Sequence, residues 1–308
     1  MIRKTIEIST PGSRLSVASR QLVIERPEYP KATLPIEDLG VVVIDDLRAS
    51  YTQSVFLDLM AAGTTVVVCG RDHLPTGMML PLDAHHAQTE RHRAQVNVSE
   101  PRRKQIWQAI VSAKINQQAQ ILIHFNGEPA GLDAMSRRVR SGDPDNFEAQ
   151  AAQRYWRQLF GKDFRRDRDA RGVNSLLNYG YAILRAAVAR AIVAAGLIPS
   201  LGVFHKNRSN AFCLADDLLE PYRPLVDWRV KVLSASGDAP KLEERATRAA
   251  LLSLFNEGLR IGDRNLPLLA AIEASAVSLA TALTGGPLNL CLPKGLPLSH
   301  ANVEGEEA

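Results

Sequence analysis

Three acidic side chains follow a histidine closely in one apolar stretch of the chain. His205 comes just after a short apolar run, and the predicted helix after it carries Asp216, Asp217 and Glu220. Asp217 and Glu220 are three residues apart and share a helix face, and Pro221 bends or ends the helix directly after them. Because the surrounding residues are mostly apolar, the segment is either a solvated acidic face or a set of buried acids that need partners.

A fourth carboxylate, Glu148, is in line with the apolar stripe of another predicted helix. Tyr155 and Leu159 follow it at i+7 and i+11. Two interpretations are open. Either Asp145 and Glu148 form a capping box, in which Glu148 turns back to the Asp145 amide, or the Glu148 carboxylate points into the domain and needs a cation.

Glu148, His205 and Glu220 together have the donor types of a mixed oxygen and nitrogen metal site. Carboxylates suit Mg²⁺ or Mn²⁺, and an imidazole shifts the preference toward Mn²⁺. Such an ion polarises a phosphoryl oxygen and neutralises charge on a leaving oxygen. The helix pattern alone does not bring positions 148 and 205 together.

A rival zinc site is suggested by a histidine-rich segment at residues 83–92. The zinc-hydrolase pattern HExxH needs two histidines four apart on one helix face, with a glutamate beside the first. His92 does not join the face that His86 and Glu90 share, so we favour a loop and a helix start here. The segment carries His85, His86, Glu90 and His92.

The elements that must position these residues change character along the chain. Up to residue 82 the pattern is mainly short β-branched runs bounded by turns, with one helix. Residues 83–284 have a helical pattern, and residues 285–308 are rich in Pro and Gly. We therefore predict an α+β protein with a small N-terminal β domain, a larger all-α catalytic domain and an extended or disordered tail.

One predicted helix, residues 176–196, is nearly long and apolar enough to cross a membrane. Arg185 and Arg190 lie in its middle, and each would cost about 2.5–3.5 kcal/mol in a bilayer. We therefore expect a helix buried in the helical domain and no membrane. The first ten residues lack an apolar signal core, so we expect a cytoplasmic protein.

The charge of the chain is compatible with a nucleic-acid partner. The 308 residues have a net charge of +4 and a pI of about 9.0. Clustered arginines are candidates for sequence-independent phosphate contacts, although for any single arginine a solvated surface is the better explanation. Asn178 and Tyr179 either line the site or pack in the core. The candidate DNA contacts are Arg137, Arg138, Arg165, Arg166, Asn178 and Tyr179.

Two blocks of the sequence resemble the CRISPR adaptation integrases, metal-dependent endonucleases that insert new spacers into CRISPR arrays. One block is LLNYGYAILRAAVARAIVAAGLIPSLGVFHKNRSNAFCLADDLLEPYRP, and the other is SGDPDNFEAQAAQRYWRQLF. The segment QTERHRAQ and the β-rich start also fit. The resemblance covers nearly the whole chain and is nearest to the type II group.

The resemblance implies roles for the acidic residues. In the family, a glutamate, a histidine and a second acid bind Mg²⁺ or Mn²⁺, and the matching residues here are Glu148, His205 and Glu220. Asp217 is a possible additional acid. The implied reaction is a transesterification in which the 3′-hydroxyl of a short DNA fragment attacks a phosphodiester at the repeat boundary. No nucleotide cofactor is expected, and no GxxxxGK[ST] phosphate loop is present.

The resemblance also implies partners. Family members form homodimers through the β domain, and two dimers bracket a dimer of a small ferredoxin-like CRISPR-associated protein in a heterohexamer. The substrates are double-stranded DNA, namely the spacer precursor and the CRISPR repeat. The alternatives are a catalytically inactive DNA-binding scaffold of the adaptation complex and, from the histidine-rich segment, a zinc hydrolase.

Overall fold

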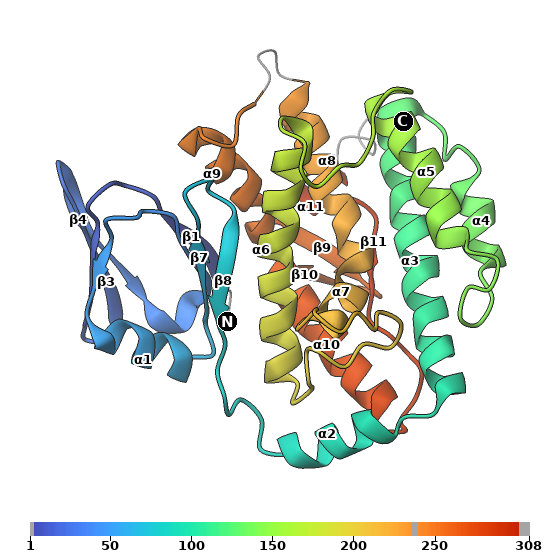
Figure 1. The fold of residues 1–308 in the computed structure, drawn as a ribbon, viewed down its shortest axis with the longest axis horizontal. Helices are drawn as coiled ribbons and strands as arrows, with labels where there is room; N and C mark the ends of the chain where they lie inside the picture. Colours follow the sequence, from blue (N-terminus) through green and yellow to red (C-terminus); the bar gives the residue numbers. More distant parts are fainter. Residues whose placement is uncertain (1–2, 236–239, 302–308) are drawn as a thin grey trace.

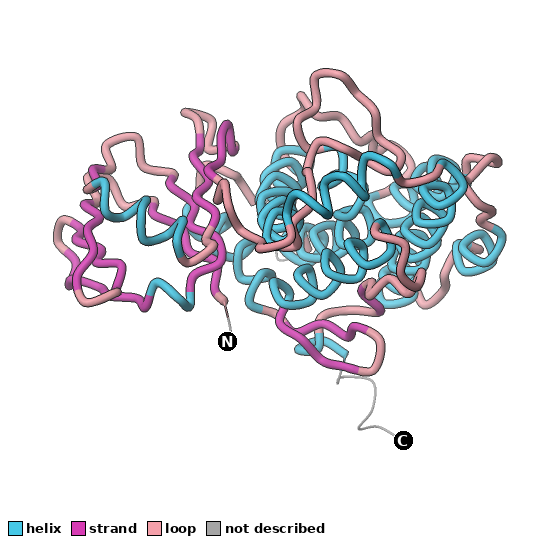
Figure 2. Tube along the Cα trace, turned by 90° about the horizontal axis from the view of Figure 1, so that it is seen from below, coloured by secondary structure: helices cyan, strands magenta, loops and turns pink. Residues whose placement is uncertain are grey.

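Strands and helices are segregated along the chain, with a β-rich part beside a larger helical part (Figures 1 and 2). The structure, a computed structural model, describes residues 3–235 and 240–301. Residues 1–2, 236–239 and 302–308 lie outside it, including the last part of the predicted tail. The predicted α+β class, with a sheet region at the N-terminus, is confirmed.

The β-rich part contains two four-stranded sheets with one helix. In the first sheet, of order β1-β5-β7-β8, β1, β5 and β7 run parallel and β8 runs antiparallel to β7. The second sheet has the order β4-β3-β2-β6. The elements are β1 (Lys4–Ile8), β2 (Arg14–Ala18), β3 (Gln21–Arg26), β4 (Tyr29–Pro35), a 3-10 turn (Ile36–Asp38), β5 (Leu39–Ile44), β6 (Ser50–Tyr51), α1 (Gln53–Ala61), β7 (Thr65–Cys69) and β8 (Pro75–Met79).

The strand β5 joins the two halves because both of its faces are buried. Successive side chains of a strand point to opposite faces of the sheet. Val42 and Ile44 therefore pack in the core between the two sheets, whereas Val41 and Val43 pack in the helical core. Leu39 also joins the core between the sheets, because the register of β5 against β1 shifts between Leu39 and Val41. This explains the continuous apolar run of β5, which an alternating half-buried strand would not show.

The helical part is built around the long helices α3 and α6. The helix α6 passes a membrane-length test, but 78% of the tested window is buried, which confirms the predicted core helix. Gly180 lets α6 approach α8, because a Cβ there would overlap the side chain of Val226. The helices are α2 (Gln88–Asn97), α3 (Glu100–Asn126), α4 (Leu132–Arg138), α5 (Phe147–Phe160), α6 (Val173–Ala194), α7 (Cys213–Leu219), α8 (Arg223–Ser234), α9 (Arg245–Ser253), α10 (Leu268–Leu283) and α11 (Leu298–Ala301).

The helical part is not all-α, which corrects the prediction. The strands β9 (Gly258–Ile261), β10 (Arg264–Pro267) and β11 (Pro293–Lys294) form a small antiparallel sheet of order β10-β9-β11, preceded by a 3-10 turn (Leu254–Asn256). The β9–β10 hairpin turns at Gly262, which has a positive φ of 56°. These strands have only two to four residues each, too few for an alternating pattern to be recognised in the sequence between two helical segments.

The segment after residue 285, predicted to be extended or disordered, is largely irregular and packs on the helical part. The strand β11 pairs with β9, and Leu292 is buried in the main core. Apolar residues on both sides of Leu292, among them Leu288, Leu290 and Leu296, pack against the same core. The Pro and Gly content therefore reflects an irregular segment that covers the helices rather than a detached tail.

A buried ionic cluster fastens the β-rich part to the helical part. Arg248 of α9 lies 2.8 Å from Oε1 of Glu7 and 2.9 Å from Oδ2 of Asp45, and all three side chains are at most 6% exposed. Tyr179 of α6 donates a hydrogen bond of 3.1 Å to Glu7, and His73 Nδ1 lies 2.9 Å from Asp45. The two carboxylates depend on Arg248 because a buried charge without a partner is costly.

We expect Arg248→Met to lower the free energy of unfolding by about 3–5 kcal/mol, because it leaves Glu7 and Asp45 buried without their cation. Urea unfolding of the native and variant chains measures this. Adding Glu7→Gln and Asp45→Asn to Arg248→Met should restore part of the loss. Arg137→Met, which removes an exposed pair with Asp133, should cost at most about 1 kcal/mol. An equally small loss for Arg248→Met would contradict a structural role of the cluster.

Candidate active site

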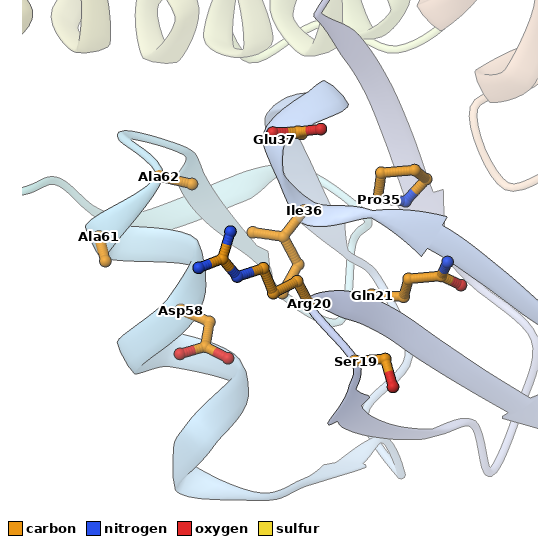
Figure 3. A pocket seen from close by; sticks show the side chains of 9 residues that line it. All are labelled: Ser19, Arg20, Gln21, Pro35, Ile36, Glu37, Asp58, Ala61 and Ala62. Atoms are coloured by element: carbon orange, nitrogen blue, oxygen red, sulfur yellow. The ribbon is translucent and has the colours of Figure 1, made fainter.

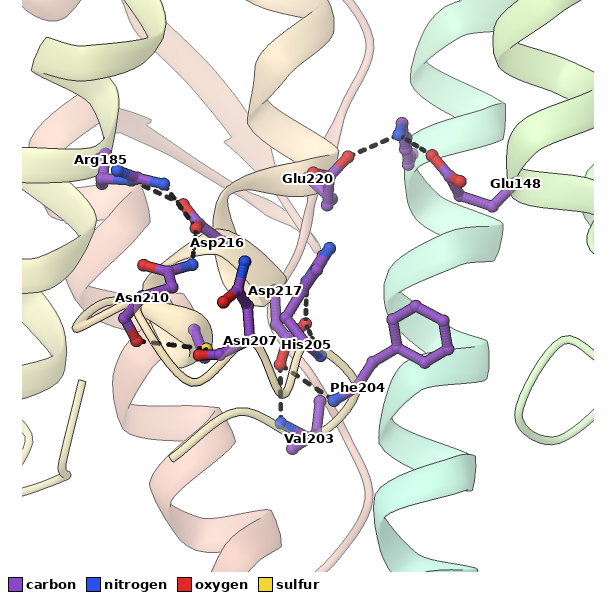
Figure 4. Close-up of polar contacts among 12 residues, drawn as sticks. Glu148, Arg185, Val203, Phe204, His205, Asn207, Asn210, Asp216, Asp217 and Glu220 are labelled. Atoms are coloured by element: carbon purple, nitrogen blue, oxygen red, sulfur yellow. Dashed lines mark hydrogen bonds and ion pairs between the residues drawn. The ribbon is translucent and has the colours of Figure 1, made fainter. Parts of the chain in front are cut away.

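A buried lysine connects the two glutamates that the sequence singled out. Lys114 lies in the middle of α3, and its side chain is only 9% exposed. Its ammonium contacts Glu148 Oε1 and lies 2.5 Å from Glu220 Oε2. Figure 4 shows the carboxylates of Glu148 and Glu220 directed toward each other. Residues 114, 148 and 220, which are far apart in the sequence, therefore meet at one place.

Glu148 points into the helical part and does not form a capping box, so that interpretation is wrong. The amide groups of Phe147 and Glu148 instead donate to the carboxylate of Asp143, at 2.9 Å each. Asp145 pairs with Arg140 on the surface. Asp143, which precedes α5, thus satisfies the first two amides of the helix and leaves the Glu148 carboxylate available to Lys114.

Glu220 lies in a 3-10 turn (Glu220–Tyr222) between α7 and α8, and its side chain is 7% exposed. Burial alone would raise the pKa of Glu220, but the nearby Arg223 and Lys114 outweigh it, and the pKa lies below its ordinary value. Arg223 Nε is 2.9 Å from Oε1. The Glu220 Oε2 atom, despite its ion pair with Lys114, accepts no aligned hydrogen bond.

Asp217 holds His205 and the loop around it. Its fully buried carboxylate accepts hydrogen bonds from the amides of Val203, Phe204 and His205 at 2.6, 3.1 and 3.1 Å. It also lies 2.6 Å from His205 Nδ1, and this contact raises the pKa of His205. With Nδ1 engaged, Nε2 is the nitrogen that His205 presents, so Asp217 is a positioning residue.

Two neighbours fix the rest of this loop. A Cβ at Gly202 would overlap the His205 carbonyl oxygen and lie 2.8 Å from Asp217 Oδ2, so the close approach requires glycine. On the other side, Phe204 stacks on Trp107 of α3 with ring centroids 4.1 Å apart, and Trp107 meets His205 edge-on at 5.8 Å. Phe204 remains 49% exposed beside His205.

The residue types fit a divalent metal, although they do not form a closed set of ligands. Within residues 3–235 and 240–301, no three His, Cys, Asp or Glu side chains converge as metal ligands. Two carboxylates and a free imidazole nitrogen are nevertheless suitable donors for Mg²⁺ or Mn²⁺. The buried Glu220 Oε2 without an aligned hydrogen bond, and the ammonium between the two glutamates, indicate a place that favours a cation.

An arginine-rich hollow of about 190 Å³ is lined by Arg223, which pairs with Glu220. Arg166 and Arg223 lie over the ring of Tyr181 at 5.4 and 4.7 Å. Arg166 also donates to Asn178 Oδ1 at 2.5 Å, so two of the predicted DNA contacts lie here. The residues that line this hollow include Arg166, Arg168, Asn178, Tyr181, Arg185, Asp216 and Arg223.

The other predicted DNA contacts lie elsewhere. Tyr179 is fully buried and bonds to Glu7 at the junction of the two parts, so the packing interpretation is correct for it. Arg165 is exposed. Arg137 pairs with Asp133, and Arg138 lies over the ring of Phe147. For Arg137, Arg138 and Arg165, contact with DNA remains a prediction.

Two other regions lack the chemistry of this site. A larger hollow, of about 710 Å³, lies in the β-rich part between Arg20, Glu37 and Asp58 and contains no histidine (Figure 3). In the segment proposed as a zinc site, the rings of His85 and His86 stack on each other at 4.5 Å. Among the described residues, this segment provides no group of three metal ligands.

The sequence reasoning missed Lys114, Arg223 and Asp227. Lys114 interrupts the apolar stripe of α3 between Val111 and Ile115, and this isolated lysine was the available signal. Asp227 is buried in α8 and accepts a hydrogen bond from Tyr181. Burial raises the pKa of Asp227 to about 7. When Asp227 is protonated it does not compete for the charge of Arg223, which pairs with Glu220.

Comparison with known proteins links the chain to one family. Residues 6–252 match the family described as CRISPR associated protein Cas1. The CRISPR-associated endonuclease Cas1 of Neisseria meningitidis is 37% identical over 296 residues, covering 95% of this chain and 97% of the relative.

Solved structures share the fold. A casposase bound to an integration product superposes with a TM-score of 0.76 at 21% identity, covering 93% of this chain and 92% of the casposase. A chain of a Cas6-RT-Cas1–Cas2 complex superposes with a TM-score of 0.69 at 19% identity, covering 91% of this chain and 35% of the other.

We expect the stability of the native chain to fall between about pH 4 and pH 7 through Asp227. The folded protein keeps a proton that the unfolded chain releases above the ordinary pKa of 3.8, so the contribution of Asp227 is lost as pH rises through about 7. From pH 5 to pH 8, the free energy of unfolding of the native chain should therefore fall by about 2–3 kcal/mol relative to that of Asp227→Asn, whose amide does not titrate.

Urea unfolding at both pH values measures this difference. Asp163→Asn, which removes an exposed acid, is the matched control and should follow the native chain. A parallel fall of Asp227→Asn and the native chain would show that Asp227 is ionised throughout.

Proposed function

The chain belongs to the CRISPR-associated Cas1 family, and on this basis we propose that it is a metal-dependent DNA endonuclease and integrase that inserts spacers into CRISPR arrays. The observation that carries the proposal is the pair Glu148 and Glu220, joined by the ammonium of Lys114, with His205 near enough that its charge helps to lower the pKa of Glu220. A scaffold without catalysis has no need of two inward-pointing carboxylates, which are costly to bury.

The proposed reaction exchanges one phosphodiester for another. The 3′-hydroxyl of the incoming DNA gives up its proton as its oxygen attacks phosphorus. The bond from phosphorus to the 3′-oxygen of the target strand breaks, and that oxygen takes up a proton, so no proton is consumed overall. Glu148, Glu220 and His205 would hold Mg²⁺ or Mn²⁺, which supplies polarisation of the phosphoryl oxygen and neutralises charge on the leaving oxygen.

The other residues of the site position these groups. Asp217 keeps the Nδ1 of His205 engaged so that Nε2 faces the site. The arginine-rich hollow lined by Arg223 provides positive charge for backbone phosphates. Because phosphate contacts orient DNA without reading its sequence, we propose that this hollow guides the strand that is cut or joined.

We also propose the assembly that the family relationship implies. A homodimer would form through the β-rich part, where Tyr29, Leu47, Tyr51 and Leu57 are 51% to 62% exposed. The solved neighbour in a Cas1–Cas2 complex supports a small CRISPR-associated partner. The ferredoxin-like fold of that partner, the heterohexamer and the type II group remain part of the proposal.

A strand-transfer reaction tests the proposed function. It contains the chain, its small partner, a short duplex with free 3′-hydroxyl ends and a plasmid with the repeat, in Mn²⁺, Mg²⁺ or chelator. We expect joining only with metal, and a loss of at least about 100-fold in Glu148→Ala and Glu220→Ala with DNA binding retained. Glu128→Ala, at an exposed acid, should match the native chain.

The other outcomes separate the alternatives. Bound DNA without nicking or joining by the native chain would identify a catalytically inactive scaffold. Joining that survives chelator or Glu220→Ala would contradict the proposed role of the carboxylates.

A further inference from the structure

Lys114 occupies the position between the two proposed ligand carboxylates. We propose that its ammonium is an internal cation that holds Glu148 and Glu220 together and is displaced when a divalent metal binds, so that Lys114 sets the metal affinity. This inference rests on the proposed function, because it assumes a metal at these carboxylates. Lys114 is a positioning residue in this role and does not itself act on the DNA.

The contacts make the exchange necessary. The ammonium touches an oxygen of each glutamate, and the Glu220 contact is 2.5 Å. A Mg²⁺ ion held by both carboxylates would need to lie about 2.0–2.1 Å from their oxygens, in the space that the ammonium takes. Two cations cannot share that space, because their repulsion is strong where water is excluded.

The surroundings indicate which cation moves. Arg223 contacts the other oxygen of Glu220, Oε1, and lies over the Tyr181 ring, so it does not block Oε2. Lys114 instead has a flexible four-carbon stem. The Glu148 side chain is 29% exposed, against 7% for Glu220, so the open side of the pair lies at Glu148. The ammonium can leave in that direction.

The same geometry gives the pair two stable states. With Lys114 in place, the carboxylates have a counter-charge and a fixed orientation before a metal arrives. With a metal in place, the ion takes over that role and Lys114 is released. The lysine therefore weakens metal binding while it keeps the ligands oriented.

Metal binding to Lys114→Met tests this directly. The methionine keeps much of the length and removes the charge. We expect the Mn²⁺ dissociation constant, measured by calorimetry on the whole chain, to fall at least about tenfold. The thermal midpoint of the variant in chelator should fall below that of the native chain and rise more steeply with Mn²⁺, because the two carboxylates then repel each other.

Two control variants limit the interpretation. Lys104→Met removes an exposed lysine of the same helix, which pairs with Glu100, and should leave the Mn²⁺ affinity unchanged. Glu220→Ala should abolish Mn²⁺ binding. If the native chain binds no Mn²⁺, or if Glu220→Ala binds as well as the native chain, the proposed metal site itself is wrong. If the native chain binds at this site and folded Lys114→Met binds equally or more weakly, only the displacement of Lys114 is refuted.

A measurement on the native chain covers the case in which Lys114→Met does not fold. The buried amine of Lys114 should react slowly with an acylating reagent in chelator and faster with saturating Mn²⁺, as read by mass spectrometry of the peptide that contains it. Lys104 serves as the internal reference in the same digest. Equal Lys114 reactivity with and without Mn²⁺ would overturn the proposal.

Discussion

Buried charge has to be paired, and this constraint organises both halves of the molecule. Arg248 joins β1 and the end of β5 to α9 through Glu7 and Asp45. Arg190, inside the long, mostly buried helix α6, donates to the carbonyl oxygen of Gly63 at 2.6 Å and pairs with an acid of α10. Each pair connects segments distant in sequence, because losing one partner leaves the other charge without compensation. The ionic contacts thereby specify how the β-rich part and the helices are placed.

The active-site region follows the same rule. Lys114 contacts Glu148 and Glu220 through one ammonium, so α3, α5 and the turn after α7 are tied at a single atom. Arg223 pairs with the other oxygen of Glu220, so the two carboxylates are matched by two cationic side chains. A divalent ion, as proposed, would therefore enter in place of the lysine rather than beside it.

The sequence predicted the residue types of the site better than their contacts. Glu148 and Glu220 stood out because they lie on apolar stretches, and the short β-branched runs predicted β5 and β7. Lys114 was missed because its role depends on two acids that only tertiary packing brings to it. The hairpin at Gly262 was missed because its strands of four residues give too short a period to distinguish.

The three acids of the segment 216–220 show why spacing could not assign their roles. Asp216 turns to Arg185 of α6 and to Asn210, whereas Asp217 turns back to the loop before the helix. Glu220 lies after α7, where the 3-10 turn directs it toward α3. On an ideal helix Asp217 and Glu220 would share a face, but the loop fixed by Gly202 and the turn at Pro221 separate their partners. Asp216 therefore secures the helix, Asp217 orients His205, and Glu220 is left to pair with Lys114.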